Sequence, residues 1–146
     1  MRTLAFFVPS NRVDSSGLPT HVDGMNEIIA ANRAHRQVGA AQERENVKHV
    51  EAFARVAMLQ AGIKPPAIPA HVTVTFVEVN RRRDVSNVFG GLKWVLDGLS
   101  RPRGAKKTGA GAIYDDSSKW VEVVPRIEYD PARPGVQIEI EYMGEV

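Results

Sequence analysis

The chain places a carboxylate directly after three consecutive arginines. Asp84 follows Arg81, Arg82 and Arg83, and all four come after an apolar run at residues 72–79 that is typical of a buried strand. A helical pattern begins a few residues later, so the charged group stands where a strand gives way to a helix. Helix N-termini present unpaired N–H groups and partial positive charge to an anion. The spacing therefore favours chemistry on a phosphate group.

The helix expected after Asp84 carries an apolar face and a polar stripe. Because helical side chains lean toward the N-terminus, we expect the ammonium of Lys93 to point back toward Asp84. Gly90 and Gly91 should each cost roughly 1 kcal/mol inside a helix, so they predict a surface that another group approaches closely. The residues that recur at steps of three and four and predict the buried face are Val88, Leu92, Val95, Leu96 and Leu99.

Simpler structural roles are open to the same residues. Ser86 could cap the helix, a position that serine fills well. Lys93 and Asp97 could form an ordinary i,i+4 ion pair, worth about 0.2 to 0.5 kcal/mol. Asp115 and Asp116 could belong to a turn, which aspartate favours.

Together these residues resemble the RusA-type Holliday-junction resolvases, in particular their phage and prophage members. The resemblance is carried by the pattern Arg-Arg-Asp-x-x-Asn over residues 82–87, a lysine six residues after Asn87, and the run Leu-Asp-Gly-Leu at 96–99. Asp115 and Asp116, which precede a final pair of expected strands, complete it. Residues 18–40 also resemble the phage branch, and the most specific part covers residues 81–119.

The resemblance implies hydrolysis of phosphodiesters in branched DNA, in recombination and repair, with Mg²⁺ or alternatively Mn²⁺. It points to Asp84 and Asp116 as metal ligands, with the adjacent Asp115 as a candidate that spacing does not exclude. Lys93 would stabilise charge in the transition state, and Asn87 would orient a ligand or a water. A homodimer is also implied, because a four-way junction has near two-fold symmetry and needs two opposed cuts.

One position departs from the family pattern. Ser86 stands at a metal-ligand position where members usually carry a second aspartate, and a hydroxyl is a poorer ligand for a hard cation than a carboxylate. Either Asp115 supplies the missing charge, or one metal suffices, or the protein binds branched DNA and cuts it poorly. A phage accessory protein that contacts another protein is a further alternative.

Clustered cations predict contacts with the DNA backbone. Residues 100–111 combine four cations with three glycines and a proline, so they predict a flexible basic loop; an ordinary solvated insertion is the alternative. Backbone contacts position DNA without reading its sequence, so recognition should favour branched shape. The cations assigned to DNA are Arg81, Arg82, Arg83, Arg101, Arg103, Lys106, Lys107 and Lys119. The cations within residues 33–49 are interpreted as a solvated helix face.

Composition sets wider bounds. A chain of 146 residues with net charge +2 predicts one domain over 1–146, and the charge is too small to indicate nucleic acid by itself. The absence of cysteine excludes disulfides and fits a reducing cytoplasm. The apolar run at 4–8 is too short for a signal peptide or a membrane span, and the four histidines lack zinc-site spacing.

The remaining pattern predicts an α+β fold with one mixed β-sheet of four to five strands packed with helices, and the resemblance implies that this fold is RusA-like. Strands are expected at 3–8, 72–79, 120–127 and 136–142. Helices are expected from Asp23 or Asn26 to Gln37 and over 41–61, with Gly39 as the interruption. Pro125 lacks a donor for the strand ladder, so its strand should lie at an edge or carry a bulge.

Overall fold

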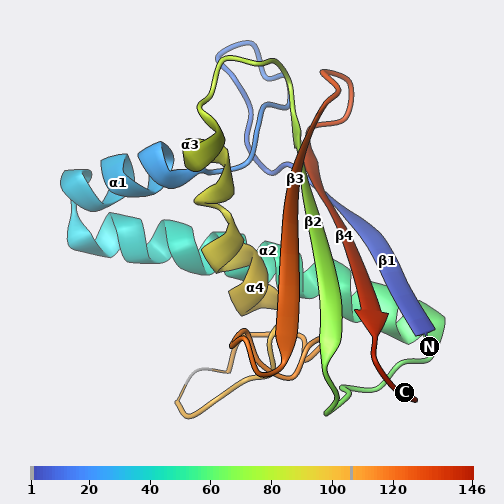
Figure 1. The fold of residues 1–146 in the computed structure, drawn as a ribbon. Helices are drawn as coiled ribbons and strands as arrows, with labels where there is room; N and C mark the ends of the chain where they lie inside the picture. Colours follow the sequence, from blue (N-terminus) through green and yellow to red (C-terminus); the bar gives the residue numbers. More distant parts are fainter. Residues whose placement is uncertain (1, 106) are drawn as a thin grey trace.

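A mixed four-stranded sheet in the order β1-β4-β2-β3 carries the helices on one face (Figure 1). The computed structural model describes residues 2–105 and 107–146. The elements are β1 (Arg2–Pro9), α1 (Met25–Ala34), α2 (Arg36–Ala61), β2 (Ala70–Glu78), α3 (Val85–Phe89), α4 (Leu92–Leu99), β3 (Val121–Tyr129) and β4 (Gly135–Tyr142). The predicted α+β class and mixed sheet are confirmed. No helix among the described residues has the length and apolar character needed to cross a membrane.

Strand direction decides where the ends of the elements lie. β4 is antiparallel to both β1 and β2, whereas β2 and β3 are parallel, with Ala70 opposite Val121 and Glu78 opposite Tyr129. β3 is an edge strand, as Pro125 predicted. Alternate side chains of β4, such as Ile138 and Ile140, are fully buried against the helices, which confirms the half-exposed alternation expected there.

The helical hairpin breaks earlier than the sequence suggested. His35 separates α1 from α2, and its Nδ1 accepts a hydrogen bond from the N–H of Gln37 at 3.0 Å. Gly39, expected to interrupt the helix, lies inside α2. A Cβ atom at this position would lie 1.9 Å from Oδ1 of Asn32 on α1, so glycine allows the two helices to approach closely.

The helix expected over residues 88–99 is two short helices joined at Gly90 and Gly91. A Cβ on Gly90 would lie 2.7 Å from Met25, and one on Gly91 would lie 2.9 Å from the ring of Phe76. The close approach that the glycine pair predicted is therefore confirmed, and the approaching groups belong to α1 and β2. Asp84, and not Ser86, occupies the N-cap position of α3.

Gly98 gives a test of how tightly α4 packs on α2. A Cβ there would lie 2.7 Å from Cβ of Val50 and 2.9 Å from the carbonyl oxygen of Val47. We expect Gly98→Ala to lower the free energy of unfolding by about 1 to 3 kcal/mol, because overpacking outweighs the gain in helix propensity. Urea denaturation measures this change. Lys93→Ala, on the exposed side of the same helix, should shift stability by no more than about 0.5 kcal/mol, and an equal loss in both variants would contradict the packing argument.

Candidate functional site

The three consecutive arginines have different surroundings. The side chain of Arg83 is only 10% exposed; its Nε and Nη2 each donate to a carboxylate oxygen of Glu78 at 2.8 Å, and its Nη1 donates to Glu27. Glu78 is itself 2% exposed at the end of β2. Within the chain the guanidinium of Arg83 is therefore used to neutralise buried and half-buried carboxylates, whereas its assignment to DNA remains a prediction.

Arg81 and Arg82 remain on the surface. The guanidinium of Arg81 stacks over the ring of Tyr129 at 3.9 Å, a cation–π contact that orients the side chain at the end of the sheet. Arg82 is exposed, and its backbone N–H donates to the side chain of Asn80. Both cations are accessible to an anion beside Asp84.

The segment after the arginines contains an exposed carboxylate on Asp84 and a side-chain amide on Asn87 that is already hydrogen-bonded. Asp84 is exposed and its side chain makes no capping hydrogen bond. Ser86 is exposed within α3. Asn87 is only 8% exposed, and its Oδ1 accepts a hydrogen bond from the N–H of Asn26 at 2.7 Å. Within one chain, Asn87 therefore holds the start of α1, and its oxygen is not free for the ligand-orienting role expected from the sequence.

Lys93 belongs to a different part of the surface. Its Nζ lies 3.7 Å from Asp97 and 3.5 Å from Glu43. The negative charge of Asp97, followed by that of Glu43, outweighs desolvation and raises the pKa of Lys93. The ordinary ion pair with Asp97 is confirmed, and the expected approach of Lys93 to Asp84 is not found.

Asp115 and Asp116 form a second acidic position just before β3. Nη2 of Arg103 lies 3.1 Å from Asp115 and 3.7 Å from Asp116, and the N–H of Asp116 donates to Asp115 at 2.9 Å. Desolvation alone would raise the pKa of Asp115, but the hydrogen bonds from Asp116 and the charge of Arg103 lower it. Both aspartates therefore already share the guanidinium of Arg103 as a partner.

The two acidic positions lie at opposite ends of the sheet. Asp84 follows the last residue of β2, whereas Asp115 and Asp116 precede the first residue of β3, and the two strands run parallel. A nine-residue strand spans about 25 to 30 Å. Among residues 2–105 and 107–146, no group of three or more His, Asp or Glu could hold a metal ion. The expectation that Asp84 and Asp116 meet is therefore not met within a single chain.

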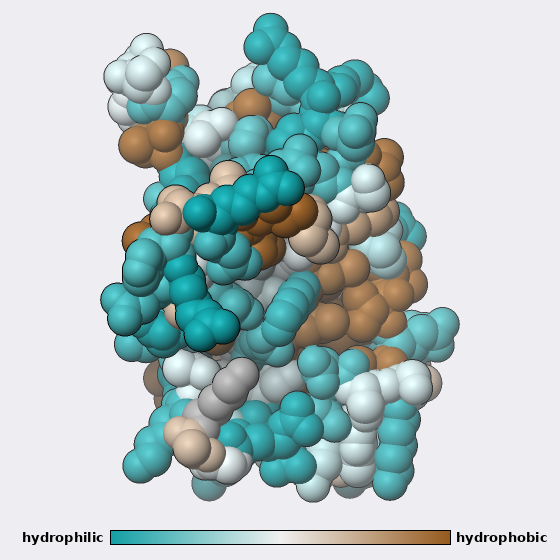
Figure 2. All heavy atoms as spheres, turned by 90° about the vertical axis from the view of Figure 1, so that its left-hand side faces the viewer, coloured by the Kyte–Doolittle hydropathy of each residue, from teal (hydrophilic) through white to brown (hydrophobic). Residues whose placement is uncertain are grey.

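A partly buried apolar face lies between these two acidic positions. Leu92 and Leu96 lie one turn apart on the side of α4 away from Gly98, which packs on α2. Figure 2 shows a continuous hydrophobic area on its right-hand side, where α3, α4 and β3 lie. The partly buried side chains that α3, α4 and β3 contribute are Phe89, Leu92, Leu96, Val123 and Ile127.

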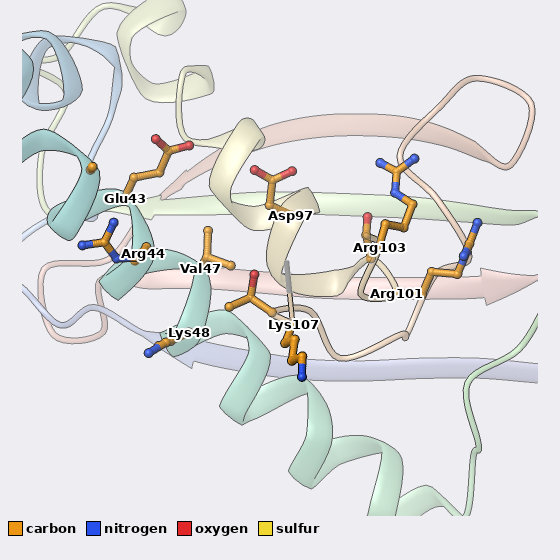
Figure 3. A pocket seen from close by; sticks show the side chains of 11 residues that line it. Glu43, Arg44, Val47, Lys48, Asp97, Arg101, Arg103 and Lys107 are labelled. Atoms are coloured by element: carbon orange, nitrogen blue, oxygen red, sulfur yellow. The ribbon is translucent and has the colours of Figure 1, made fainter. Parts of the chain in front are cut away.

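A basic cavity of about 530 Å³ opens between α2, α4 and the loop after α4. Figure 3 shows side chains of α2 on one side and loop side chains on the other, with Asp97 of α4 between them. The residues that line it are Ala40, Glu43, Arg44, Val47, Lys48, Asp97, Ser100, Arg101, Arg103, Lys107 and Thr108.

The cavity accounts for only part of the predicted DNA-binding set. Arg101, Arg103 and Lys107 line it, while Lys119 lies apart with its Nζ 5.5 Å from the ring centroid of Trp120. Lys106 lies outside the described residues. Sequence reasoning missed Arg44 and Lys48, whose i,i+4 spacing is the same in a solvated face and in a cavity wall.

Comparison with known proteins adds no relative. A scan against models of protein families finds no match for the chain, and a search of curated proteins finds no similar sequence.

Arg82 and Arg83 are neighbours with different surroundings, so substituting each of them tests whether the Glu78 ion pair stabilises this segment. Arg83→Ala should lower the free energy of unfolding by about 3 to 5 kcal/mol, because it leaves the Glu78 carboxylate buried without its partner. Arg82→Ala removes the same charge from the surface and should change stability by no more than about 0.5 kcal/mol. Thermal and urea unfolding of the two variants measures the difference. Equal stability of both variants would show that the Glu78 ion pair does not hold this segment.

Proposed function

We propose that the protein is a metal-dependent endonuclease that cleaves branched DNA as a C2 homodimer, with each active site shared between two chains. The observation that carries the proposal is the placement of Asp84 and of Asp115 and Asp116 at the two ends of one partly buried apolar face. The resemblance to RusA-type resolvases supports the reaction class.

A two-fold axis would bring the two acidic positions together. In a C2 interface the same patch packs on its own copy, so an axis through the middle of the apolar face exchanges its ends. The start of α3 in one chain, with Asp84, would then lie beside the start of β3 in its partner. The partly buried Leu92, Leu96 and Ile127 would be covered by the same contact, which gains free energy by removing apolar surface from water.

The donor groups suit a hard divalent cation. Asp84 offers an exposed carboxylate, and Asp115 and Asp116 offer two more, so an interchain set would consist of oxygen ligands such as Mg²⁺ prefers. A bound cation would supply an activated water and neutralise charge on the phosphate. The chain itself would hold the flanking backbone through Arg81 and Arg82, which lie beside Asp84.

The symmetry of the dimer matches the substrate. Two equivalent sites related by a two-fold axis can make opposed cuts in a four-way junction, which has nearly the same symmetry. A role in DNA recombination and repair follows from this substrate.

A non-cleaving junction-binding protein is the second candidate. Ser86 is exposed two residues from Asp84 and adds no negative charge to the proposed ligand set. Arg103 also neutralises Asp115 and Asp116 in this structure. Both features weaken the attraction for a cation and leave the basic surfaces intact.

The shared site can be tested by mixing inactive chains. We expect Asp84→Asn and Asp116→Asn each to abolish Mg²⁺-dependent nicking of a labelled four-way junction. A heterodimer of the two variants keeps one site with both carboxylates, so a 1:1 mixture should regain about a quarter of the wild-type sites and yield single nicks. EDTA should remove this activity.

Each alternative gives a different result in the same assay. If both carboxylates acted within one chain, the mixture would remain inactive. Tight junction binding by the wild type without nicks would support the non-cleaving candidate. Absence of both binding and nicking would support a protein-contact role. Asp115→Asn, mixed with Asp84→Asn in the same way, shows which of the adjacent aspartates is needed.

The apolar face makes a separate prediction about assembly. Leu96→Glu should convert the dimer to a monomer, because a carboxylate at the centre of the face would be desolvated without a partner. Sedimentation velocity measures the mass. Leu59→Glu is the control, since this α2 side chain is 81% exposed and its replacement should leave the mass unchanged. A wild-type monomer at all concentrations would contradict the dimer.

A further inference from the structure

The basic cavity has more positive than negative charge available for a ligand. Its two acidic residues, Glu43 and Asp97, both lie within 4.0 Å of Nζ of Lys93 and are partly neutralised by it. Arg44 and Lys48 stand one helical turn apart on the α2 wall, where like charges repel each other. An anion between the α2 wall and the loop would relieve this repulsion.

Arg101 adds a donor that the protein does not satisfy. Its guanidinium stacks over the ring of Tyr114 at 4.1 Å, which fixes the side chain at the cavity. Its Nε is buried and has no hydrogen-bond partner among the described residues. A buried donor without an acceptor is unfavourable, so the position favours a ligand that brings an acceptor oxygen.

The size and lining of the cavity fit one nucleotide unit of a nucleic acid strand. Its volume of about 530 Å³ is within the range of small-molecule sites. Val47 and Ala40 give it an apolar wall, while the cations stand around it. This combination suits one nucleotide unit, with its phosphate on the cations and its less polar part on the apolar wall.

Arg103 belongs both to this cavity and to the acidic pair. It lines the cavity and also lies 3.1 Å from Asp115 and 3.7 Å from Asp116. Its side chain is 52% exposed, so it can change position with little loss of packing. Guanidinium binds phosphate and carboxylate with the same fork of N–H donors, so a phosphate in the cavity would compete with the two aspartates for Arg103.

We propose that the cavity binds a phosphate of a DNA strand through Arg44, Lys48 and Arg101, and that Arg103 moves from Asp115 and Asp116 to this phosphate. The binding step is independent of cleavage. The release of the aspartates rests on the proposed function, because it makes their carboxylates available to a metal ion only when DNA is in place.

The first experiment measures binding without metal. A fluorescent single strand of ten thymidines is titrated with protein in EDTA at several salt concentrations. Arg44→Gln with Lys48→Gln should weaken binding several-fold and reduce the slope of log affinity against log salt by about 0.7, since both side chains contact the same phosphate and one phosphate contact to a single strand contributes about 0.7. Arg33→Gln with Arg36→Gln removes the same charge from the exposed α1–α2 turn and should leave the slope unchanged.

Two outcomes would overturn the binding site. One is an equal decrease of the slope in both double variants, which would show that strand binding depends only on the net charge of the protein. The other is equally tight binding of free thymidine monophosphate, which would indicate a nucleotide site and not a site for a DNA strand.

The second experiment measures the coupling through Arg103. Mn²⁺ binding is followed by electron paramagnetic resonance with and without the single strand, which has no branch to cut. The strand should tighten Mn²⁺ binding to the wild type, and Mn²⁺ should tighten strand binding by the same factor. In Arg103→Gln, Mn²⁺ binding should already be tight and insensitive to the strand.

The outcomes separate the coupling from the proposed function. Mn²⁺ binding that is the same with and without the strand in the wild type would overturn the coupling alone. No Mn²⁺ binding under either condition would overturn both the coupling and the metal-dependent endonuclease, while the phosphate site would still be judged by the salt slopes.

Discussion

The buried carboxylate of Glu78 constrains the whole end of the molecule that carries the arginines. A charge at the end of a core strand must be neutralised, and the fork of Arg83 does this through two hydrogen bonds of 2.8 Å. Because Arg83 also contacts Glu27, the turn after β2 is fixed to both the sheet and α1. Asp84 follows Arg83 directly, so its exposed carboxylate lies on a segment whose backbone is held in place. The same fixation leaves Arg81 and Arg82 as the cations that face solvent.

Close packing on one side of the α3–α4 segment explains the apolar face on the other. Gly90, Gly91 and Gly98 let this segment lie directly against α1, β2 and α2, at distances that any side chain would prevent. In this close-packed position, α4 buries Val95 and Leu99 but leaves Leu92 and Leu96 only partly covered. The edge strand β3 adds Val123 and Ile127 to the same side. Partly exposed apolar surface commonly marks an interaction site, and the proposed dimer uses this face.

Local patterns in the sequence predicted most of the fold and less of the site. The alternation of apolar and polar residues identified the strands, and Pro125 identified the edge strand. Both signals depend on neighbours along the chain. The sequence could not distinguish Arg83 from Arg82, since the difference lies in a carboxylate whose burial depends on the tertiary fold. It also could not show that β2 and β3 are parallel, and this direction separates Asp84 from Asp116. The resemblance predicts that Asp84 and Asp116 act together, and it does not specify whether they come from one chain.

Electrostatics links the proposed dimer to the basic cavity. Bringing Asp84 of one chain beside Asp115 and Asp116 of its partner concentrates negative charge, and without cations this would oppose association. Arg103 already neutralises part of the acidic pair, and Arg81 and Arg82 stand beside Asp84, so the empty interface would not be a cluster of unpaired carboxylates. Under the proposed coupling, the loss of the Arg103 contacts is offset only when another anion binds Arg103 and a metal cation takes its place beside the aspartates. Metal and DNA should therefore favour each other's binding, because each relieves the charge imbalance that the other creates.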